Sequence, residues 1–316
     1  MGDKLKCLVV GCTPLAEKVS KILFNKGCLV GVVNLHPSLG AKKSNYTIVD
    51  FAEKNIPSYF TKDINDQETH SWISNKKPDV VFQCGWSQIF KKHILDIPSK
   101  FCLGFHPSPL PMGRGAAVLN WKIIESEGQD VAWGNSLFVM EEKTDTGAVI
   151  DFEPLTIEKR DDIRTAYLKV DNTSCKMVAR SLGKILKNKI HSIQQNHREA
   201  TRYYKRSPED GMMNMNWSAT KINDYVRALT HPYPGAFFET KIGKIFVWES
   251  IVLKSNKTQK PGTIINIDKN GVELSTGSQS SIQIKRISYG KQEFWADSIF
   301  QELGLKAGDS LLNDME

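Results

Sequence analysis

A histidine and an arginine stand in a stretch of the chain with many backbone constraints. His106 follows an apolar run, 101–105, and precedes three alternating prolines and an arginine between two glycines. A histidine at such a place can exchange a proton near neutral pH or polarise a carbonyl group. The prolines stiffen the turn, while Gly113 and Gly115 let the backbone approach a ligand and Arg114 can bind a phosphate bidentately. A structural histidine beside a solvated arginine fits the same residues.

A carboxylate further along the chain is the second group that could do chemistry. Asp145 lies between two threonines and before a glycine, after an alternating stretch over 131–140. A turn aspartate commonly accepts hydrogen bonds from nearby backbone N–H groups. Beside His106, the same carboxylate would orient the imidazole or take a proton from an attacking amine. The spacing alone leaves both interpretations open.

A glycine turn near the N-terminus is a third candidate. Gly11-Cys12-Thr13-Pro14 follows an apolar run and precedes a helix-like stretch. It lacks the second and third glycines of a dinucleotide-binding fingerprint. Backbone N–H groups at a helix N-terminus can still bind a phosphate. The segment therefore predicts either a phosphate-binding turn or a tight turn alone.

The elements that would position these groups alternate between strands and helices. Residues 5–10 and 28–33 are continuous apolar runs, typical of strands buried on both faces, with a helix-like pattern between them. This order predicts a βαβ unit and hence a parallel sheet. Further helices are predicted over 46–54, 68–75, 116–125 and 161–187, and further strands near 58 and over 79–83, 101–105 and 131–140. The sequence thus predicts an open, doubly wound, Rossmann-like α/β domain with His106 at a strand end, where sites of such sheets lie.

The composition changes at residues 200–215, which form a polar, linker-like segment. A helix is predicted beyond it over 218–229. Short strands follow near 237 and over 245–248, 262–267, 272–275 and 282–287, separated by Gly and Asn turns. Regular short strands predict a small β-rich domain, of the oligonucleotide/oligosaccharide-binding (OB) barrel type. We therefore expect a catalytic domain over 1–204 and an OB-like C-terminal domain over 205–316.

Length, charge and cysteine content narrow the class of protein. The 316 residues can bury a substantial core, and the formal net charge of +7 suits a diphosphate substrate as well as RNA. The six cysteines contain no CxxC pair, and no two histidines have metal-ligand spacing, which argues against a metal site. Reduced thiols in a cytoplasmic protein are the expectation. The first apolar run is too short for a signal peptide or a membrane span.

The stretch around His106 is part of a longer series of motifs. His106-Pro107-Ser108-Pro109-Leu110-Pro111, Arg114-Gly115-Ala116-Ala117 and Asn120-Trp121 resemble the signature of formyltransferases that use 10-formyltetrahydrofolate. Asp145-Thr146-Gly147 resembles the second signature of that family. The resemblance continues through Gly85-Trp86-Ser87-Gln88, Arg206-Ser207-Pro208-Glu209-Asp210-Gly211 and Pro232-Tyr233-Pro234-Gly235-Ala236-Phe237. It covers nearly the whole chain.

This resemblance implies a catalytic Asn-His-Asp triad in the doubly wound domain. His106 and Asp145 match its last two members, but Gly104 stands where the asparagine is expected. Glycine has no side chain that could donate a hydrogen bond to the formyl oxygen, so part of the usual stabilisation is absent. His106, a backbone N–H group or a water molecule would have to replace it.

The resemblance also implies which residues meet the substrates. The pterin of 10-formyltetrahydrofolate is expected at two loops, which contain Gly85, Trp86, Ser87, Gln88 and Ile89, and Glu141 and Thr144. No metal is implied. Thr13 and Arg114 are the candidates near the sugar or diphosphate of the acceptor.

The acceptor itself is inferred from the C-terminal half. Segments 206–211, 232–238 and 245–248 look most similar to sugar-nucleotide N-formyltransferases, so we expect transfer to the amino group of a nucleotide-linked amino sugar. A methionyl-tRNA formyltransferase is the first alternative, because length, positive charge and a β-rich C-terminus also fit it. A 10-formyltetrahydrofolate hydrolase and a non-catalytic folate- or nucleotide-binding module are the others. We also expect that the protein can form a homodimer and that it has no membrane partner.

Overall fold

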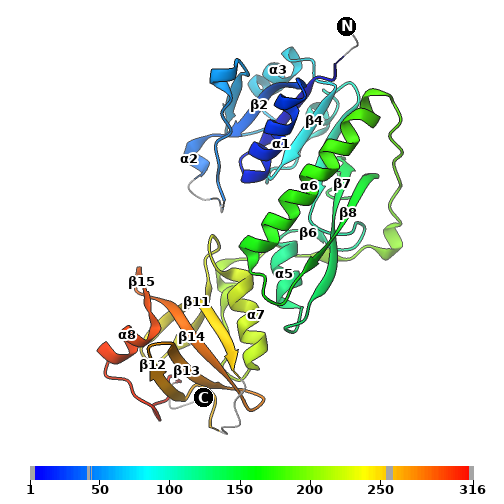
Figure 1. Cartoon of the computed structure of the whole chain (residues 1–316). Coiled ribbons are helices and arrows are strands. Elements are labelled where there is room, and N and C mark those ends of the chain that lie inside the picture. The colour runs from blue at the N-terminus through cyan, green and yellow to red at the C-terminus, as the bar shows by residue number, and fades with distance from the viewer. Residues whose placement is uncertain (1–3, 41–42, 44, 254–258, 313–316) are drawn as a thin grey trace. The chain divides into compact units, whose positions relative to one another are not determined.

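The computed structural model describes residues 4–40, 43, 45–253 and 259–312 (Figure 1). The chain forms two compact units, each made of several segments. The first comprises Met1–Val118, Ala132–Thr156 and Tyr167–Tyr204, and the second Leu119–Val131, Ile157–Ala166 and Lys205–Glu316. The division into domains 1–204 and 205–316 stays a prediction.

A seven-stranded sheet organises the first unit, in the order β3-β2-β1-β4-β5-β7-β8. Its strands are β1 (Cys7–Gly11), β2 (Leu29–Leu35), β3 (Ser58–Thr61), β4 (Val80–Cys84), β5 (Phe101–His106), β7 (Val131–Val139) and β8 (Val149–Ile157). The first five are parallel to one another, whereas β7 runs antiparallel to β5. The predicted Rossmann-like sheet is therefore confirmed, with two strands added beyond its parallel part.

Helices cover both faces of this sheet. They are α1 (Pro14–Asn25), α2 (Pro37–Gly40), α3 (Gln67–Asn75), α4 (Lys92–Leu95) and α6 (Ile163–Leu186), with the short helical turns η1 (Ala52–Lys54) and η2 (His197–Glu199). Cys7 and Val9 pack in one cluster with residues of α1 and α6, and Leu8 and Val10 pack in another with residues of α3 and α4. Successive strand residues point to opposite faces, which explains why β1 is apolar throughout.

The helix predicted over residues 46–54 is wrong, since only η1 is helical there. The Asn34 side chain donates to the carbonyl oxygen of Val49 at 3.0 Å and accepts from its N–H at 2.9 Å. The Thr47 N–H donates to the carbonyl oxygen of Cys12 at 2.9 Å. These bonds occupy backbone groups that a helix would need, so tertiary partners override the local pattern.

An antiparallel sheet of six strands forms the second unit, in the order β10-β11-β14-β13-β12 with β15 paired to β14. The strands are β10 (Ala236–Thr240), β11 (Gly243–Leu253), β12 (Ile264–Asp268), β13 (Gly271–Thr276), β14 (Ser280–Tyr289) and β15 (Gln292–Trp295). The helical elements are α5 (Val118–Ile124), η3 (Pro208–Gly211), α7 (Ala219–Leu229) and α8 (Ala296–Glu302). The predicted β-rich C-terminal domain is confirmed, whereas its closure into an OB-type barrel stays a prediction.

Side-chain burial explains how α7 joins this unit. Ser218 caps the helix by accepting from the Lys221 N–H, and Ile222, Val226 and Leu229 recur at helical spacing and are buried. Across the described residues, no helix is both long and apolar enough to cross a bilayer.

Candidate active site

His106 closes strand β5, and its imidazole is buried. Its Nε2 atom lies 2.7 Å from the carbonyl oxygen of Gly113. Because a carbonyl oxygen only accepts, Nε2 carries the hydrogen of this contact. The other ring nitrogen, Nδ1, lies 3.6 Å from Oδ1 of Asp145. The structure thus brings together the two residues predicted to be catalytic, at an ion-pair distance.

The proline turn that carries Gly113 is held from several sides. The hydroxyl of Ser108 donates to the carbonyl oxygen of Met112, and the hydroxyl of Ser136 on β7 donates to the carbonyl oxygen of Ser108, each at 2.7 Å. The indole N–H of Trp133 donates to the carbonyl oxygen of Pro107 at 2.8 Å. These bonds hold the turn in which the carbonyl oxygen of Gly113 accepts from the His106 ring.

Asp145 has an uncommon backbone conformation. Its φ of 61° lies in the left-handed region, which disfavours residues other than glycine. Its Oδ2 accepts from the N–H of Gly115 at 2.8 Å. Position 115 requires glycine, because a Cβ atom there would lie 2.1 Å from the carbonyl oxygen of Tyr203. Gly147 is required as well, since a Cβ atom there would lie 1.8 Å from the carbonyl oxygen of Val139.

This arrangement determines which imidazole nitrogen can move a proton. Nε2 is engaged by the carbonyl oxygen of Gly113, so Nδ1 is the exchangeable position, next to Asp145. A neutral ring presents a lone pair at Nδ1, and a protonated ring presents an N–H group there. The pair can therefore accept, hold and return one proton within a site that excludes most water.

Gly104 faces two apolar side chains. A Cβ atom at this position would lie 3.1 Å from Cγ of Met140 and 3.1 Å from Cε1 of Phe138. Both distances are shorter than ordinary van der Waals contact, so a larger residue would have to move these neighbours. The position that lacks the expected asparagine is thus bounded by a thioether and a phenyl ring.

The first loop expected to meet the cofactor follows strand β4. Gly85 is exposed with φ of 73° and packs against Thr13, whose hydroxyl donates to the carbonyl oxygen of Cys84 at 3.2 Å. The Gln88 side chain accepts from the N–H of Ile64 at 3.0 Å and from the buried indole of Trp86 at 3.1 Å. Ser87 and Ile89 are exposed.

The second loop expected at the cofactor follows strand β7. Glu141 and Thr144 are exposed, and Thr146 pins the turn by donating to the carbonyl oxygen of Lys143 at 2.8 Å. Arg202 donates to the carbonyl oxygen of Thr144 at 3.4 Å. Whether these two loops bind one ligand together stays a prediction.

Arg114 is buried, and its guanidinium group has partners within the first unit. Its Nε donates to Oε1 of Gln195 at 3.1 Å, and its Nη2 donates to the same oxygen and to Nδ1 of His197 at 2.9 Å. Burial lowers the pKa of Arg114, and the nearby charge of Arg202 acts in the same direction. Sequence reasoning missed Gln195 and His197, because they lie in a polar segment with no periodic pattern.

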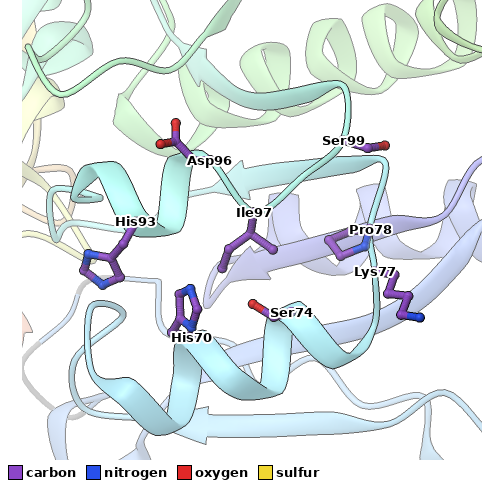
Figure 2. Close-up of a pocket in the computed structure, with 8 residues that line it drawn as sticks. All are labelled: His70, Ser74, Lys77, Pro78, His93, Asp96, Ile97 and Ser99. Carbon is purple, nitrogen blue, oxygen red and sulfur yellow. The ribbon is translucent and has the colours of Figure 1, made fainter.

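Away from these residues, the first unit has a hollow of about 420 Å³, which none of the predicted site residues lines and whose lining side chains are drawn in Figure 2. His70 on α3 and His93 on α4 lie beside each other in it, with ring centroids 5.7 Å apart. Nε2 of His93 is 3.0 Å from the carbonyl oxygen of Asn65. Among the residues that the structure describes, no three His, Cys, Asp or Glu side chains gather in a metal-binding group.

Comparisons with known proteins match both parts of the chain. The family model described as "Formyl transferase" matches residues 39–182, and that described as "Formyl transferase, C-terminal domain" matches residues 205–304. The bifunctional polymyxin resistance protein ArnA of Wigglesworthia glossinidia brevipalpis is 36% identical over 214 residues, which is 67% of this chain. This chain spans only 32% of that relative.

A solved structure shows the same fold. It is described as WlaRD, a sugar 3N-formyl transferase in the presence of dTDP and 5-N-formyl-THF, and it superposes with a TM-score of 0.63 at 17% identity. The superposition covers 90% of this chain and 98% of WlaRD.

A relative of similar length matches most of this chain in sequence. A methionyl-tRNA formyltransferase of Alkaliphilus oremlandii (strain OhILAs) is 30% identical over 294 residues, covering 90% of this chain and 92% of the relative. Identity sustained along so much of both proteins indicates common descent, and this chain therefore belongs to the formyl transferase family.

Proposed function

We propose that this chain transfers the formyl group of 10-formyltetrahydrofolate to the amino group of a nucleotide-linked amino sugar. The observation that carries the proposal is the buried pair of His106 and Asp145, 3.6 Å apart, in a chain of the formyl transferase family. Such a pair can supply general acid–base catalysis at a carbonyl carbon.

The residues of both loops fit a folate donor. Gly85 presents an exposed peptide without a side chain, and Ser87 and Ile89 add an exposed hydroxyl and an exposed apolar surface. Glu141 and Thr144 add exposed polar groups. Such a mixture suits a flat heterocycle with polar edges. When bound, the donor supplies an activated formyl group.

The two catalytic side chains have complementary tasks. Asp145 can take the proton that an attacking amine must lose, and the pair can return a proton to the N10 nitrogen of the donor when the bond between that nitrogen and the formyl carbon breaks. His106, fixed at Nε2 by Gly113, can hold a proton at Nδ1 for the oxygen on which negative charge develops. Burial of both side chains strengthens these charge interactions. No asparagine amide assists at Gly104, so His106 is the proposed main stabiliser.

The acceptor is proposed to lie near Thr13 and Arg114. Thr13 precedes α1, and the positive end of the helix dipole favours a nearby phosphate, although Pro14 has no N–H group and those of Ala16 and Glu17 donate to the carbonyl oxygen of Thr13. Gln195 and His197 engage the Nε and Nη2 donors of Arg114, so this residue can offer a diphosphate its positive charge and a contact through Nη1, but not a bidentate contact through Nε and Nη2. The solved sugar 3N-formyl transferase supports an amino-sugar acceptor.

A charged initiator tRNA is the second candidate acceptor. The relative named methionyl-tRNA formyltransferase matches this chain over 92% of its own length, including the C-terminal region. The formal charge of +7 also suits a nucleic acid. Binding to tRNA would weaken steeply with salt, whereas binding to a nucleoside diphosphate would have a shallower dependence.

One assay separates these proposals. The protein is incubated with 10-formyltetrahydrofolate and either a panel of nucleoside-diphosphate-linked amino sugars or charged initiator tRNA, and products are identified by mass. Formylated sugar supports the first proposal. Formylmethionyl-tRNA alone rejects it in favour of the second, free formate alone indicates hydrolysis, and tight folate binding without product indicates a binding module.

A cytoplasmic location and homodimerisation belong to the same proposal. All six cysteines are free, as expected of a protein in a reducing compartment. Gel filtration with light scattering tests the dimer.

A further inference from the structure

The hydrogen bonds around Asp145 close into a ring. The side-chain carboxylate of Asp145 accepts from the Gly115 N–H at 2.8 Å. The backbone carbonyl oxygen of Asp145 accepts from Nε2 of Gln195 at 3.0 Å. Oε1 of Gln195 accepts from Arg114, the residue just before Gly115. The ring thus links three segments that are far apart in the sequence and returns to its starting point.

Gln195 holds the Asp145 turn at two points. Its Nε2 donates to the carbonyl oxygen of Asp145 at 3.0 Å and to that of Gly147 at 2.7 Å. Two bonds on either side of Thr146 fix the orientation of the turn as well as its position. The left-handed conformation of Asp145 is less favourable than the right-handed or extended one, and these bonds help to hold it.

Arg114 fixes which way the Gln195 amide faces. The guanidinium group has only donors, so it must meet the amide oxygen, and the NH₂ group then points at the two carbonyl oxygens. Nδ1 of His197 accepts at 2.9 Å from Nη2, which also donates to Gln195. Both Arg114 and Gln195 are buried, which strengthens these bonds.

We propose that Gln195, oriented by Arg114, is a positioning residue that holds the Asp145 carboxylate against His106 and the Gly115 N–H. Gln195 reaches this position because the segment after α6 is tied to strand β8 by a bridge between Val149 and Ile193. The kinetic part of the inference rests on the proposed function, whereas its structural part does not.

Two substitutions at position 195 separate its contacts. Gln195→Glu keeps oxygen acceptors for Arg114 but removes the donors to both carbonyl oxygens. Gln195→Met removes every polar contact at a similar side-chain length. Gln194 is the neighbouring glutamine and is exposed, so Gln194→Glu and Gln194→Met are matched controls.

The expected kinetic result is a loss of turnover without a loss of binding. Both variants at position 195 lower kcat by about tenfold to a hundredfold, because small misplacements of a reacting group cost that much, while KM for donor and acceptor stays within about twofold. The controls behave as the unsubstituted protein. A kcat unchanged in both variants overturns the positioning role.

Hydrogen exchange tests the ring without any turnover. The Gly115 amide exchanges at least about tenfold faster in both variants, because its carboxylate acceptor is released, while strand β1 keeps its protection as a check of the fold. Unchanged exchange at Gly115 overturns the inference. If no acceptor is formylated by any form of the protein, the proposed function fails, and the exchange result still decides whether Gln195 holds Asp145.

Discussion

Gly104 lies opposite Phe138 in the antiparallel ladder between β5 and β7, and a Cβ atom at position 104 would be 3.1 Å from the Phe138 ring. Met140, two residues further on, bounds the same space at 3.1 Å. The space that an asparagine side chain would enter therefore borders on apolar groups. Phe138 and Met140 therefore limit the size of the side chain that position 104 can hold without a shift of these neighbours.

An asparagine at position 104 should assist turnover only if the neighbouring side chains leave space for its amide group. Gly104→Asn alone changes kcat by less than about threefold, because Phe138 and Met140 displace the amide. Adding Met140→Ala raises kcat by at least about tenfold, since one well-placed oxyanion donor is worth about a hundredfold or more elsewhere. Steady-state kinetics with the formyl donor measure this, and Met140→Ala alone is the control. A full gain from Gly104→Asn alone would show that the neighbours do not matter.

Removing the imidazole should abolish most turnover. His106→Asn lowers kcat by about 10² to 10⁴, the usual contribution of a positioned acid–base group, with little change in folding by circular dichroism. His36 provides a matched control, because it also follows a strand and precedes a proline. His36→Asn is expected to keep its activity. Near-normal turnover in His106→Asn would reject the proposed role of this residue.

The second unit contains a buried ion pair within α7. Nε of Arg227 donates to Oδ1 of Asp224 at 2.9 Å, and Asp224 is fully buried. Arg227 also donates to the carbonyl oxygen of Asp161 at 2.7 Å. Arg227→Met leaves the carboxylate without its counter-ion, so the free energy of unfolding should fall by about 3 to 5 kcal/mol. Urea denaturation measures this loss.

The same variant should show a defined pH dependence. Burial raises the pKa of Asp224, and Arg227 opposes that rise, so the pKa rises further in the variant. A raised folded-state pKa contributes stability below the unfolded-state pKa, and this contribution is lost as pH rises through the folded-state value. The defect should therefore be smaller near about pH 5 than near about pH 8. An equal defect at both pH values would contradict the ion-pair explanation.

The cysteines should differ in reactivity. A hydrogen bond with the Cys7 thiol lowers the pKa of Cys28 to about 7, and the charges of Lys4 and Lys26 act in the same direction. Burial instead raises the pKa of Cys102 to about 12. Iodoacetamide should therefore label Cys28 first, at a rate that rises through about pH 7, because the thiolate is the nucleophile.

Peptide mapping by mass spectrometry identifies the labelled position. Cys28→Ser should remove the fast phase and leave the slow ones. Faster labelling of Cys175, which is also partly exposed, would contradict this order.

The sequence predicted those strands and helices whose formation depends on residues close to one another along the chain. The apolar run before Gly11 predicted β1, because a strand buried on both faces requires it, and α1 begins at Pro14, a favoured first helical residue. The segment around Val49 was mispredicted, because Asn34 holds its backbone from another element. Only tertiary structure could reveal that contact.

The same distinction applies to the candidate site. His106 and Asp145 stood out because a strand-end histidine and a glycine-flanked turn aspartate are local features. Gln195 and His197 did not, because their importance depends on a partner about eighty residues away that the chain brings near. The apolar neighbours of Gly104 were equally invisible, since strand pairing alone places them there.

Formyl transfer with a labelled donor tests the central claim most directly. The protein and its Asp145→Asn variant are each given 10-formyltetrahydrofolate with an isotopic label in the formyl group, together with dTDP-linked amino sugars. We predict labelled N-formyl sugar from the unsubstituted protein and at least about a hundredfold less from Asp145→Asn, which keeps an acceptor for Gly115 but loses the charge. Label found only in formylmethionyl-tRNA or in free formate, or an equal yield from the variant, would contradict the proposal.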